Sequence, residues 1–202
     1  MGLNDSVKLV LREYAESLIL ALLLALFLRF FVVSAYRIPS DSMSPTLLKG
    51  DFVLAYKLPY GVRIPFLDQK WAGRAPYRGE VVVFRCPGRL RSTCLKRVVA
   101  LEGDRVELRD GELWVNERPA EKEGAGPGTS VANYGPVVVP PGHFFALSDD
   151  LMAKEDSRRW GAVAVNELEG RVFLIWLSLD WEVSESEKWP ALRRNRLFQW
   201  IN

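Results

Sequence analysis

The 202-residue chain carries a formal net charge of +2, and its basic residues are interspersed with acidic ones rather than gathered in one patch. A balance this mild excludes the strongly basic surface that nucleic-acid binding needs, so we expect no nucleic-acid partner. One histidine and two cysteines are also too few for the usual four-ligand structural zinc site, and we expect neither a metal nor a cofactor.

The first elements in chain order are a polar segment, residues 1–16, and an apolar one, residues 17–36. A helix of this length, rising about 1.5 Å per residue, covers the hydrocarbon core of a bilayer, roughly 30 Å thick. Arg29 interrupts the apolar run near its far end, where a long side chain can reach the lipid headgroups. The sequence therefore predicts one spanning helix at residues 17–36. A cleavable signal peptide, with a small-residue cleavage site at residues 33–35, is the alternative.

Residues 37–51 follow the apolar run and combine serines, a threonine, a methionine and two prolines. Pro39 and Pro45 prevent a regular helix, because proline lacks a backbone N–H and restricts the residue before it. We expect an extended, shaped loop that holds serines where a membrane segment meets water. Loops rich in Ser, Thr and Pro are common at protein surfaces, so composition alone does not make one of these serines catalytic.

The rest of the chain alternates short apolar stretches with turn signals. Stretches rich in β-branched and aromatic residues predict strands at residues 52–57, 81–84, 95–101, 105–108, 112–115, 137–139, 144–147 and 171–177. Asp110-Gly111 between two of them is a strong hairpin signal. Residues 117–134 have little periodicity and indicate a mobile insertion. The pattern predicts a mainly β fold, an antiparallel sheet arranged as a sandwich or barrel, with a smaller β insertion at about residues 103–142.

A lysine is the main candidate for activating a serine in this chain. The single histidine, His143, stands beside prolines and phenylalanines, where it is more often structural than catalytic. Lys96 lies inside an apolar strand, where burial would lower its pKa, although an edge-strand lysine that faces solvent fits the same residues. Cys86 and Cys94 are spaced for a disulfide across a hairpin loop.

Together these pieces resemble the bacterial type I signal peptidases, membrane-anchored endopeptidases with a Ser/Lys dyad. The resemblance covers almost the whole chain and keeps the family order. Its matching pieces are the apolar N-terminal segment, Ile-Pro-Ser-Asp-Ser-Met-Ser-Pro-Thr-Leu at residues 38–47, and residues 50–57, 60–65, 78–84, 96–99, 103–104, 156–158 and 160–161. The Ser-x-Met-x-Pro-Thr-Leu and Lys-Arg pieces in this order are specific.

The resemblance implies that Ser42 is the nucleophile and Lys96 the general base. The lysine must be neutral to accept the serine proton, and lowering its pKa from about 10.4 towards 8 disfavours its charged form by roughly 3 kcal/mol. An apolar strand supplies the necessary desolvation. The same resemblance assigns the oxyanion hole to the Ser42 backbone N–H and the Ser40 hydroxyl.

Family members cut after small residues at positions −1 and −3 of a signal peptide, and the resemblance implies an apolar pocket that accepts them. The matching positions here are Tyr36, Ile38, Pro39, Met43, Leu47, Val53, Val83 and Leu95. These residues suit an ordinary core equally well. An extended substrate would bind by strand addition, with backbone hydrogen bonds giving affinity and shallow pockets giving specificity.

The resemblance also implies where the chain works and with what. Residues 1–16 would lie in the cytoplasm, and residues 37–202 would form a catalytic domain on the extracytoplasmic, periplasmic side of the bacterial cytoplasmic membrane. The implied partners are the signal peptides of exported preproteins and membrane lipid, and we expect a monomer. Basic and aromatic residues at 189–201 fit either a membrane-surface anchor or a closing strand and tail.

One segment departs from the family pattern. Residues 148–158 keep the length of a family loop but not its middle, and Lys154 stands where the family has a serine that hydrogen-bonds the catalytic lysine. Either Lys154 tunes Lys96 by like-charge repulsion, or Ser148 or Ser157 supplies the missing hydroxyl.

Asp156 and Arg158 close this segment, and the resemblance implies that they form an ion pair that braces the site. The altered segment leaves one rival function, a catalytically impaired homologue that binds exported peptides without turnover. The prediction is a membrane-anchored serine endopeptidase that removes signal peptides with Ser42 and Lys96.

Overall fold

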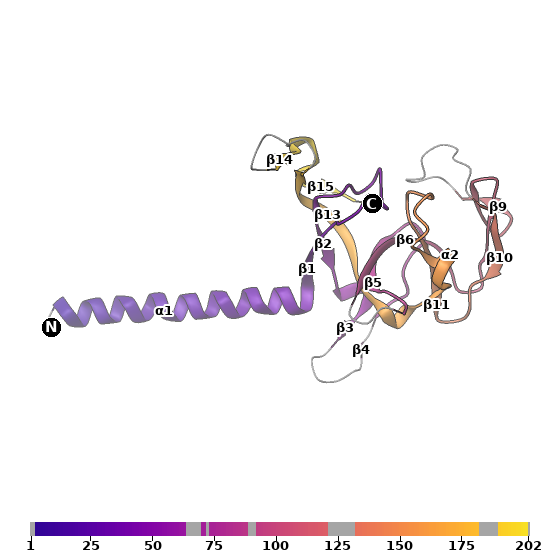
Figure 1. Cartoon of the computed structure of the whole chain (residues 1–202). Helices are drawn as coiled ribbons and strands as arrows, with labels where there is room; N and C mark the ends of the chain where they lie inside the picture. The colour runs from indigo at the N-terminus through magenta and orange to yellow at the C-terminus, as the bar shows by residue number, and fades with distance from the viewer. Residues whose placement is uncertain are drawn as a thin grey trace.

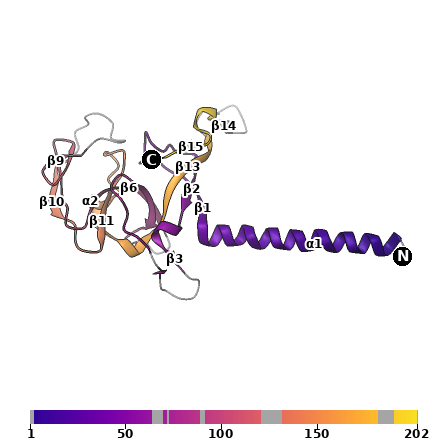
Figure 2. The same cartoon turned by 180° about the vertical axis from the view of Figure 1, so that it is seen from behind.

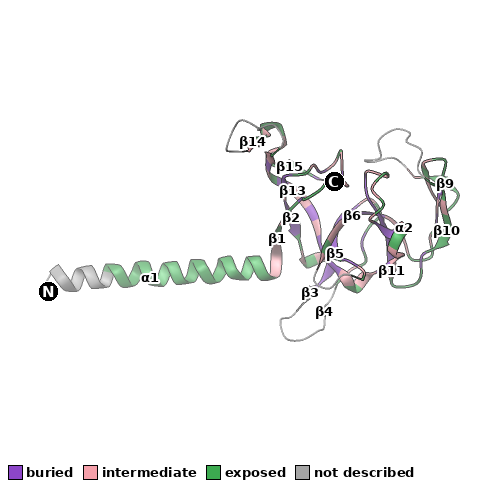
Figure 3. Ribbon diagram, viewed as in Figure 1, coloured by how far each residue is buried: buried purple, intermediate pink, exposed green. Residues whose placement is uncertain are grey.

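A long N-terminal helix projects from a β-rich domain in the computed structural model of the chain (Figures 1 and 2). The structure describes residues 3–63, 70–71, 73–88, 92–120, 132–181 and 190–201. Helix α1 (Leu3–Phe27) continues as a π-helical turn (Leu28–Val32), and the segment Val10–Val32 is long and apolar enough to cross a membrane. The helix stands clear of the domain and is exposed over most of this segment (Figure 3). An apolar surface of this length is suited to lipid.

The helix starts and ends earlier than the predicted residues 17–36. The polar residues before the apolar run are already helical from Leu3, whereas Val33–Arg37 leave the helix and form strand β1. Strand β1 pairs with β2 (Asp51–Tyr56). The first residues of β1 are apolar and β-branched or small, so they fit both a membrane helix and a strand, and hydropathy did not mark the boundary.

Lys57 ties the end of the helix to the domain. Its Nζ lies 3.3 Å from the backbone carbonyl oxygens of both Arg29 and Phe30. The last carbonyls of a helix lack partners within the helix, so an ammonium group that donates to them stabilises the helix end. The backbone N–H of Lys57 also donates to the carbonyl of Val32 at 2.9 Å. The helix therefore leaves the domain at a defined point beside β2.

A nine-stranded antiparallel sheet forms the body of the described domain, in the order β1-β2-β13-β5-β6-β11-β12, with β14 and β15 both paired to β13. Long β13 crosses the middle of Figure 1 and contacts strands from both ends of the chain. The remaining strands of this sheet are β5 (Val81–Arg85), β6 (Thr93–Leu101), β11 (His143–Leu147), β12 (Val163–Ala164), β13 (Leu168–Asp180), β14 (Ala191–Leu192) and β15 (Gln199–Trp200).

A smaller four-stranded sheet lies at the far side of the domain from α1 (Figure 1). Its order is β10-β7-β8-β9, with β7 (Arg105–Arg109), β8 (Glu112–Val115), β9 (Arg118–Pro119) and β10 (Tyr134–Val138). Asp110 and Gly111 join β7 to β8 with φ of 50° and 81°, the positive values that a tight hairpin turn of type I′ requires. The remaining described elements are the paired strands β3 (Val62–Arg63) and β4 (Lys70–Trp71), helix α2 (Ser157–Trp160), and short helical turns at Leu58–Tyr60, Val165–Glu167 and Arg194–Arg196.

The prediction of a mainly β, antiparallel fold with one N-terminal apolar helix is confirmed. Each predicted strand overlaps an observed one, because alternating or continuous β-branched runs are long enough to be recognised. The two-residue strands β3, β4, β9, β12, β14 and β15 were not predicted, since so few residues carry no periodicity. Most of the predicted mobile insertion at residues 117–134 lies outside the described residues.

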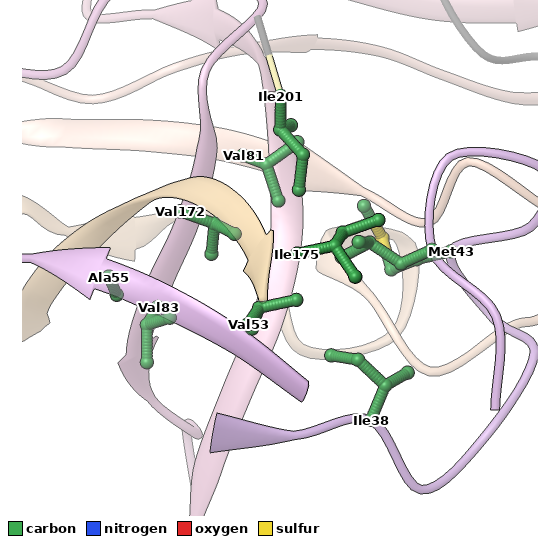
Figure 4. Close-up of a cluster of buried hydrophobic side chains, with 10 residues drawn as sticks. Ile38, Met43, Val53, Ala55, Val81, Val83, Val172, Ile175 and Ile201 are labelled. Carbon is green, nitrogen blue, oxygen red and sulfur yellow. The ribbon is translucent and has the colours of Figure 1, made fainter. Parts of the chain in front are cut away.

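A buried cluster lies directly beneath the loop between β1 and β2 (Figure 4). From the loop come Ile38, Met43 and Leu47, and the sheet and C-terminal segment supply Val53, Ala55, Val81, Val83, Val172, Ile175 and Ile201. Met43 and Leu47 are joined by a backbone hydrogen bond of 2.8 Å and are both fully buried. Burial of such side chains stabilises by about 1.5–3 kcal/mol each, so two anchors hold the loop that carries Ser42 onto the sheet.

Candidate active site

The structure brings Ser42 and Lys96 together. Ser42 lies in the loop between β1 and β2, one residue before the buried anchor Met43, and Lys96 lies within β6. Lys96 Nζ is hydrogen-bonded to Ser42 Oγ at 3.0 Å. The serine is half-buried, whereas the lysine is only 5% exposed. A strand holds the amine rigidly and a packed loop presents the hydroxyl to it.

Burial lowers the pKa of Lys96 below the ordinary lysine value of 10.5. The carboxylates of Asp156 and Asp149 oppose this shift by favouring the charged form, and the Arg158 guanidinium reinforces it. Desolvation is the largest of these effects, so the neutral amine gains population relative to a lysine in water. A neutral amine within hydrogen-bond distance of a hydroxyl can accept its proton.

Two further contacts shape the surroundings of Ser42. Ser40 Oγ is exposed and lies 3.3 Å from Ser42 Oγ, so both hydroxyls face the same space. The backbone N–H of Asp150 donates to the carbonyl of Ser42 at 3.1 Å. This second bond joins the nucleophile loop to the segment after β11, which the sequence identified as altered.

An ion pair between Arg97 and Asp149 lies next to Lys96. The guanidinium donates two hydrogen bonds of 2.8 Å to the carboxylate, and both side chains are buried. Arg97 also donates to the Thr46 hydroxyl at 3.0 Å, which links β6 to the nucleophile loop. The sequence analysis included Arg97 and Thr46 only as parts of motifs and assigned no role to Asp149. The partners are about 50 positions apart, and no local pattern joins them.

Asp156 and Arg158 form a close ion pair that closes residues 148–158 on themselves. Arg158 Nη2 lies 2.6 Å from Asp156 Oδ2, and the guanidinium also donates to the carbonyls of Leu151 and Ala153 at 2.7 and 2.5 Å. The carboxylate accepts the backbone N–H of Ser148 at 3.1 Å as well. One arginine and one buried carboxylate therefore set the shape of the loop.

The three candidates for the group that acts on Lys96 occupy different environments. Lys154 is exposed. Ser157 is buried, and its Oγ accepts the backbone N–H of Ala146 at 3.0 Å. Ser148 is buried too, but its Oγ has no hydrogen-bond partner among the described residues. A buried hydroxyl without a partner is costly, which makes Ser148 the feature of this loop that calls for an explanation.

An open cleft of about 720 Å³ runs past the Ser42 hydroxyl and the Lys96 amine. The predicted pocket residues on its lining are Tyr36, Ile38, Pro39, Met43, Val83 and Leu95. Leu47 and Val53 are fully buried in the cluster beneath the cleft, so their predicted place in the pocket wall is corrected to a place in the core that supports it. Trp160, which the sequence analysis did not single out as a pocket residue, also lines the cleft.

Cys86 and Cys94 form a disulfide, with their Cα atoms 5.1 Å apart. The bridge joins the residue after β5 to the second residue of β6, and Cys94 lies on the cleft lining. Lys96 follows two positions later on the same strand. The disulfide therefore fixes the end of the hairpin from which the amine projects.

A serine hydroxyl bonded to a buried amine beside an open cleft is an arrangement in which the amine can activate the serine as a nucleophile. The family described as signal peptidase, peptidase S26, matches residues 11–177. The chain therefore belongs to the signal peptidase family, and the resemblance drawn from its motifs is confirmed.

Several relatives show the breadth of this family. Signal peptidase I of Pseudomonas aeruginosa is 36% identical over 208 residues, covering 84% of this chain and 73% of the relative. Thylakoidal processing peptidase 1 of Arabidopsis thaliana is 33% identical, covering 83% of this chain and 49% of the relative. A Staphylococcus aureus protein named inactive signal peptidase IA is 29% identical, covering 80% and 89%. A solved structure of a signal peptidase I from Enterococcus faecalis matches with a TM-score of 0.42 and 24% identity, covering 48% of this chain and 97% of that one.

Proposed function

We propose that this protein is a membrane-anchored serine endopeptidase that removes N-terminal signal peptides from exported preproteins. The observation that carries the proposal is the 3.0 Å hydrogen bond between Ser42 Oγ and the Nζ of a buried lysine whose pKa is lowered. Membership of the signal peptidase family and an apolar helix long enough to span a membrane support the choice of substrate and location.

In the proposed reaction Lys96 acts as the general base and Ser42 as the nucleophile. The neutral amine takes the hydroxyl proton while Ser42 Oγ attacks the carbonyl carbon of the small residue at position −1. The Ser42 backbone N–H and the Ser40 hydroxyl stabilise the oxyanion. Collapse of the tetrahedral intermediate expels the new amino terminus, which receives its proton from the Lys96 ammonium. Water activated by the regenerated neutral amine then hydrolyses the acyl-enzyme.

For the altered loop we favour the Ser148 hydroxyl as the group that orients Lys96. Leu147 pairs with Arg97 across β11 and β6, so one further residue in the same antiparallel register sets Ser148 opposite Lys96. Opposite residues of an antiparallel pair project to the same face with Cβ atoms about 5 Å apart. A buried hydroxyl without a partner and a buried amine that bonds Ser42 are then neighbours. Lys154 is less suited to orient Lys96 because it is exposed, and Ser157 is less suited because its hydroxyl already accepts the Ala146 N–H.

Substrate choice would follow from the walls of the cleft. Ile38 and Met43 are buried at its base, and Tyr36, Val83 and Leu95 add apolar surface around the serine. Shallow apolar pockets accept small side chains at −1 and −3 and leave no room for large ones. The backbone of an extended substrate would pair with the strands beside the cleft, which makes binding depend little on the remaining side chains.

In this proposal the apolar helix anchors the domain, so the reaction occurs at a membrane surface. The π-helical turn after α1 runs straight into β1, and Ser42 follows β1 by only a few residues, so the chain carries the serine a short way from the helix end. We propose that the domain faces the extracytoplasmic side of the bacterial cytoplasmic membrane, where the end of a signal peptide emerges. The partners are then the preprotein and lipid, and a single chain contains every proposed catalytic group.

The rival function is binding of exported peptides without turnover, and a relative bears a name that marks it as inactive. The intact hydrogen bond between the Ser42 hydroxyl and the lysine favours turnover here. The test uses the full chain in detergent with a preprotein, and mass spectrometry maps the cut site. Cleavage after small residues at −1 and −3, absent in Ser42→Ala and in Lys96→Ala, supports the peptidase. Binding of the preprotein without cleavage by the wild type would establish the rival.

A further inference from the structure

The C-terminal segment folds back onto the loop that carries Ser42. Strand β15 pairs with β13, and Ile201 joins the buried cluster beneath the loop, where it lies near Val81 (Figure 4). Immediately before this strand, Arg196 lies against residues 46–51 with its side chain only 12% exposed. An arginine side chain is usually exposed to solvent, so its burial against this loop requires partners.

Arg196 joins two different parts of the loop at once. Its Nη2 donates to Asp51 Oδ2 at 2.7 Å and to the backbone carbonyl of Thr46 at 2.8 Å, and its Nε lies 3.3 Å from Asp51 Oδ1. Asp51 is fully buried and also accepts the Ser178 hydroxyl at 2.6 Å and the Leu48 N–H at 2.9 Å. The guanidinium thus spans the distance between the turn that follows Ser42 and the start of β2.

The same turn is tied to the strand of the catalytic base. The Thr46 hydroxyl accepts a hydrogen bond from Arg97, which forms the buried ion pair with Asp149. Thr46 therefore accepts one hydrogen bond from Arg196 on its backbone oxygen and another from Arg97 on its side-chain oxygen. The two arginines hold one residue of the nucleophile loop between the C-terminal segment and β6, next to the bond between Ser42 and Lys96.

We propose that Arg196 is a positioning residue, which sets the distance between Ser42 and Lys96 by clamping the turn at Thr46 to the buried carboxylate of Asp51. This inference rests on the proposed peptidase function. Arg196 is not among the described residues that line the cleft, and its hydrogen bonds go to Asp51 and Thr46, so its effect is on alignment. An arginine suits the task because its planar fork can bond a carboxylate and a carbonyl together, whereas a lysine offers a single point charge.

The neighbouring arginines provide contrasts within the same segment. Arg194 is exposed and belongs to the same short helical turn, Arg194–Arg196. Arg194→Ala is therefore the matched control for Arg196→Ala. Arg193 pairs with Asp180 and donates to the carbonyl of Lys49, farther along the loop, so it is not a neutral control.

The kinetic test measures kcat and KM for cleavage of a preprotein by the full chain in detergent. Arg196→Ala should lower kcat by about 10- to 100-fold, since displacement of a reacting group by about 1 Å can cost 10²-fold. KM should stay within about twofold, because the cleft walls are not altered. Arg194→Ala should match the wild type in both constants. A folded Arg196→Ala protein with wild-type kcat would overturn the proposal.

Arg196→Lys keeps a positive charge beside the buried Asp51. This variant tests the proposal even if Arg196→Ala does not fold. It should melt close to the wild type and still lose several-fold in kcat, because an ammonium cannot reproduce the fork. Full kcat in Arg196→Lys would show that charge alone is needed and would refute the clamp.

A second readout does not depend on cleavage and so separates this inference from the proposed function. Hydrogen exchange is followed at residues 40–50 in the Ser42→Ala chain, where Leu48 and Lys49 donate to carboxylates of the loop. Adding Arg196→Ala should speed exchange of this segment by about tenfold, while Arg194→Ala should not. Should the wild type prove inactive, faster exchange would still support the clamp, and unchanged exchange would reject it.

Discussion

Replacing Lys96 by methionine should abolish cleavage without lowering the stability of the domain. Methionine keeps an unbranched side chain in the apolar strand but has no nitrogen to accept the serine proton. Cleavage should fall by about 10³- to 10⁶-fold, the range lost when one member of a nucleophile and base pair is removed. The substitution therefore separates the chemical role of the residue from its contribution to folding.

The expected stability follows from the burial of the amine. Lys96 is 5% exposed, and removing its hydrogen bond to Ser42 costs about 1 kcal/mol net. Removing a buried polar group from an apolar strand recovers about 1–3 kcal/mol of desolvation. The balance predicts a free energy of unfolding that is unchanged or higher by up to about 2 kcal/mol, which corresponds to a rise in Tm of about 4–8 °C at the upper limit.

Both quantities can be measured on one preparation of the full chain in detergent, by preprotein cleavage and by thermal unfolding. Arg118→Met replaces an exposed basic residue on β9 of the smaller sheet and should change neither result. The reasoning would be refuted if Lys96→Met retained substantial cleavage. It would fail equally if the variant melted well below both the wild type and the control, because Lys96 would then be mainly structural.

Three further predictions concern the same site. The pH profile of kcat/KM should rise as Lys96 loses its proton and level off below pH 10.5. The reason is that burial lowers the pKa of this amine and only its neutral form is a base. A value of kcat/KM that still rises through pH 10.5 would contradict this. Ser148→Ala should lower kcat by roughly tenfold, because it removes the hydroxyl that, in our proposal, bonds Lys96 when the reacting groups align, a hydrogen bond of about 1.4 kcal/mol that the described residues do not show; Ser148→Thr keeps the hydroxyl and most of the rate. If Lys154→Met shifts the pH profile and Ser148→Ala does not, Lys154 tunes the base instead. Reduction of the Cys86–Cys94 bridge should lower the free energy of unfolding by about 2.5 kcal/mol and Tm by about 5–10 °C, measured by calorimetry with and without a thiol; no change in Tm would show that the hairpin is held by its other contacts.

The sequence predicted the sheet better than it predicted the end of the helix. Strand β5 opens with three valines and β6 is a longer, largely apolar stretch, and both were located to within about two residues. The apolar run, by contrast, passes from helix to strand at Val33 without any change in hydropathy. The boundary is decided by the pairing of β1 with β2, a tertiary contact that the local pattern does not contain.

Ser42 and Lys96 were found through family motifs, since local residue patterns left both assignments open. Their meeting depends on how the loop after β1 folds over the sheet, which no spacing rule gives. The clamp formed by Arg196 and Asp51 joins positions 145 residues apart and had no motif to reveal it. A buried arginine near the chain end could be recognised as different from its exposed neighbour Arg194 only when the packing of the segment was known.

The site combines one rigid partner with one that must be held in place. Lys96 belongs to a nine-residue strand in the middle of the sheet, so its backbone has little freedom. Ser42 belongs to a loop, and the loop keeps its shape only because buried side chains, the Asp150 N–H, and the two arginines that meet at Thr46 each fix a different part of it. Loss of the Asp150 N–H bond, or of either arginine's hydrogen bond to Thr46, should therefore lower kcat before it unfolds the domain. A proton transfer over 3.0 Å depends on alignment, whereas the stability of the sheet depends on burial that these contacts only supplement.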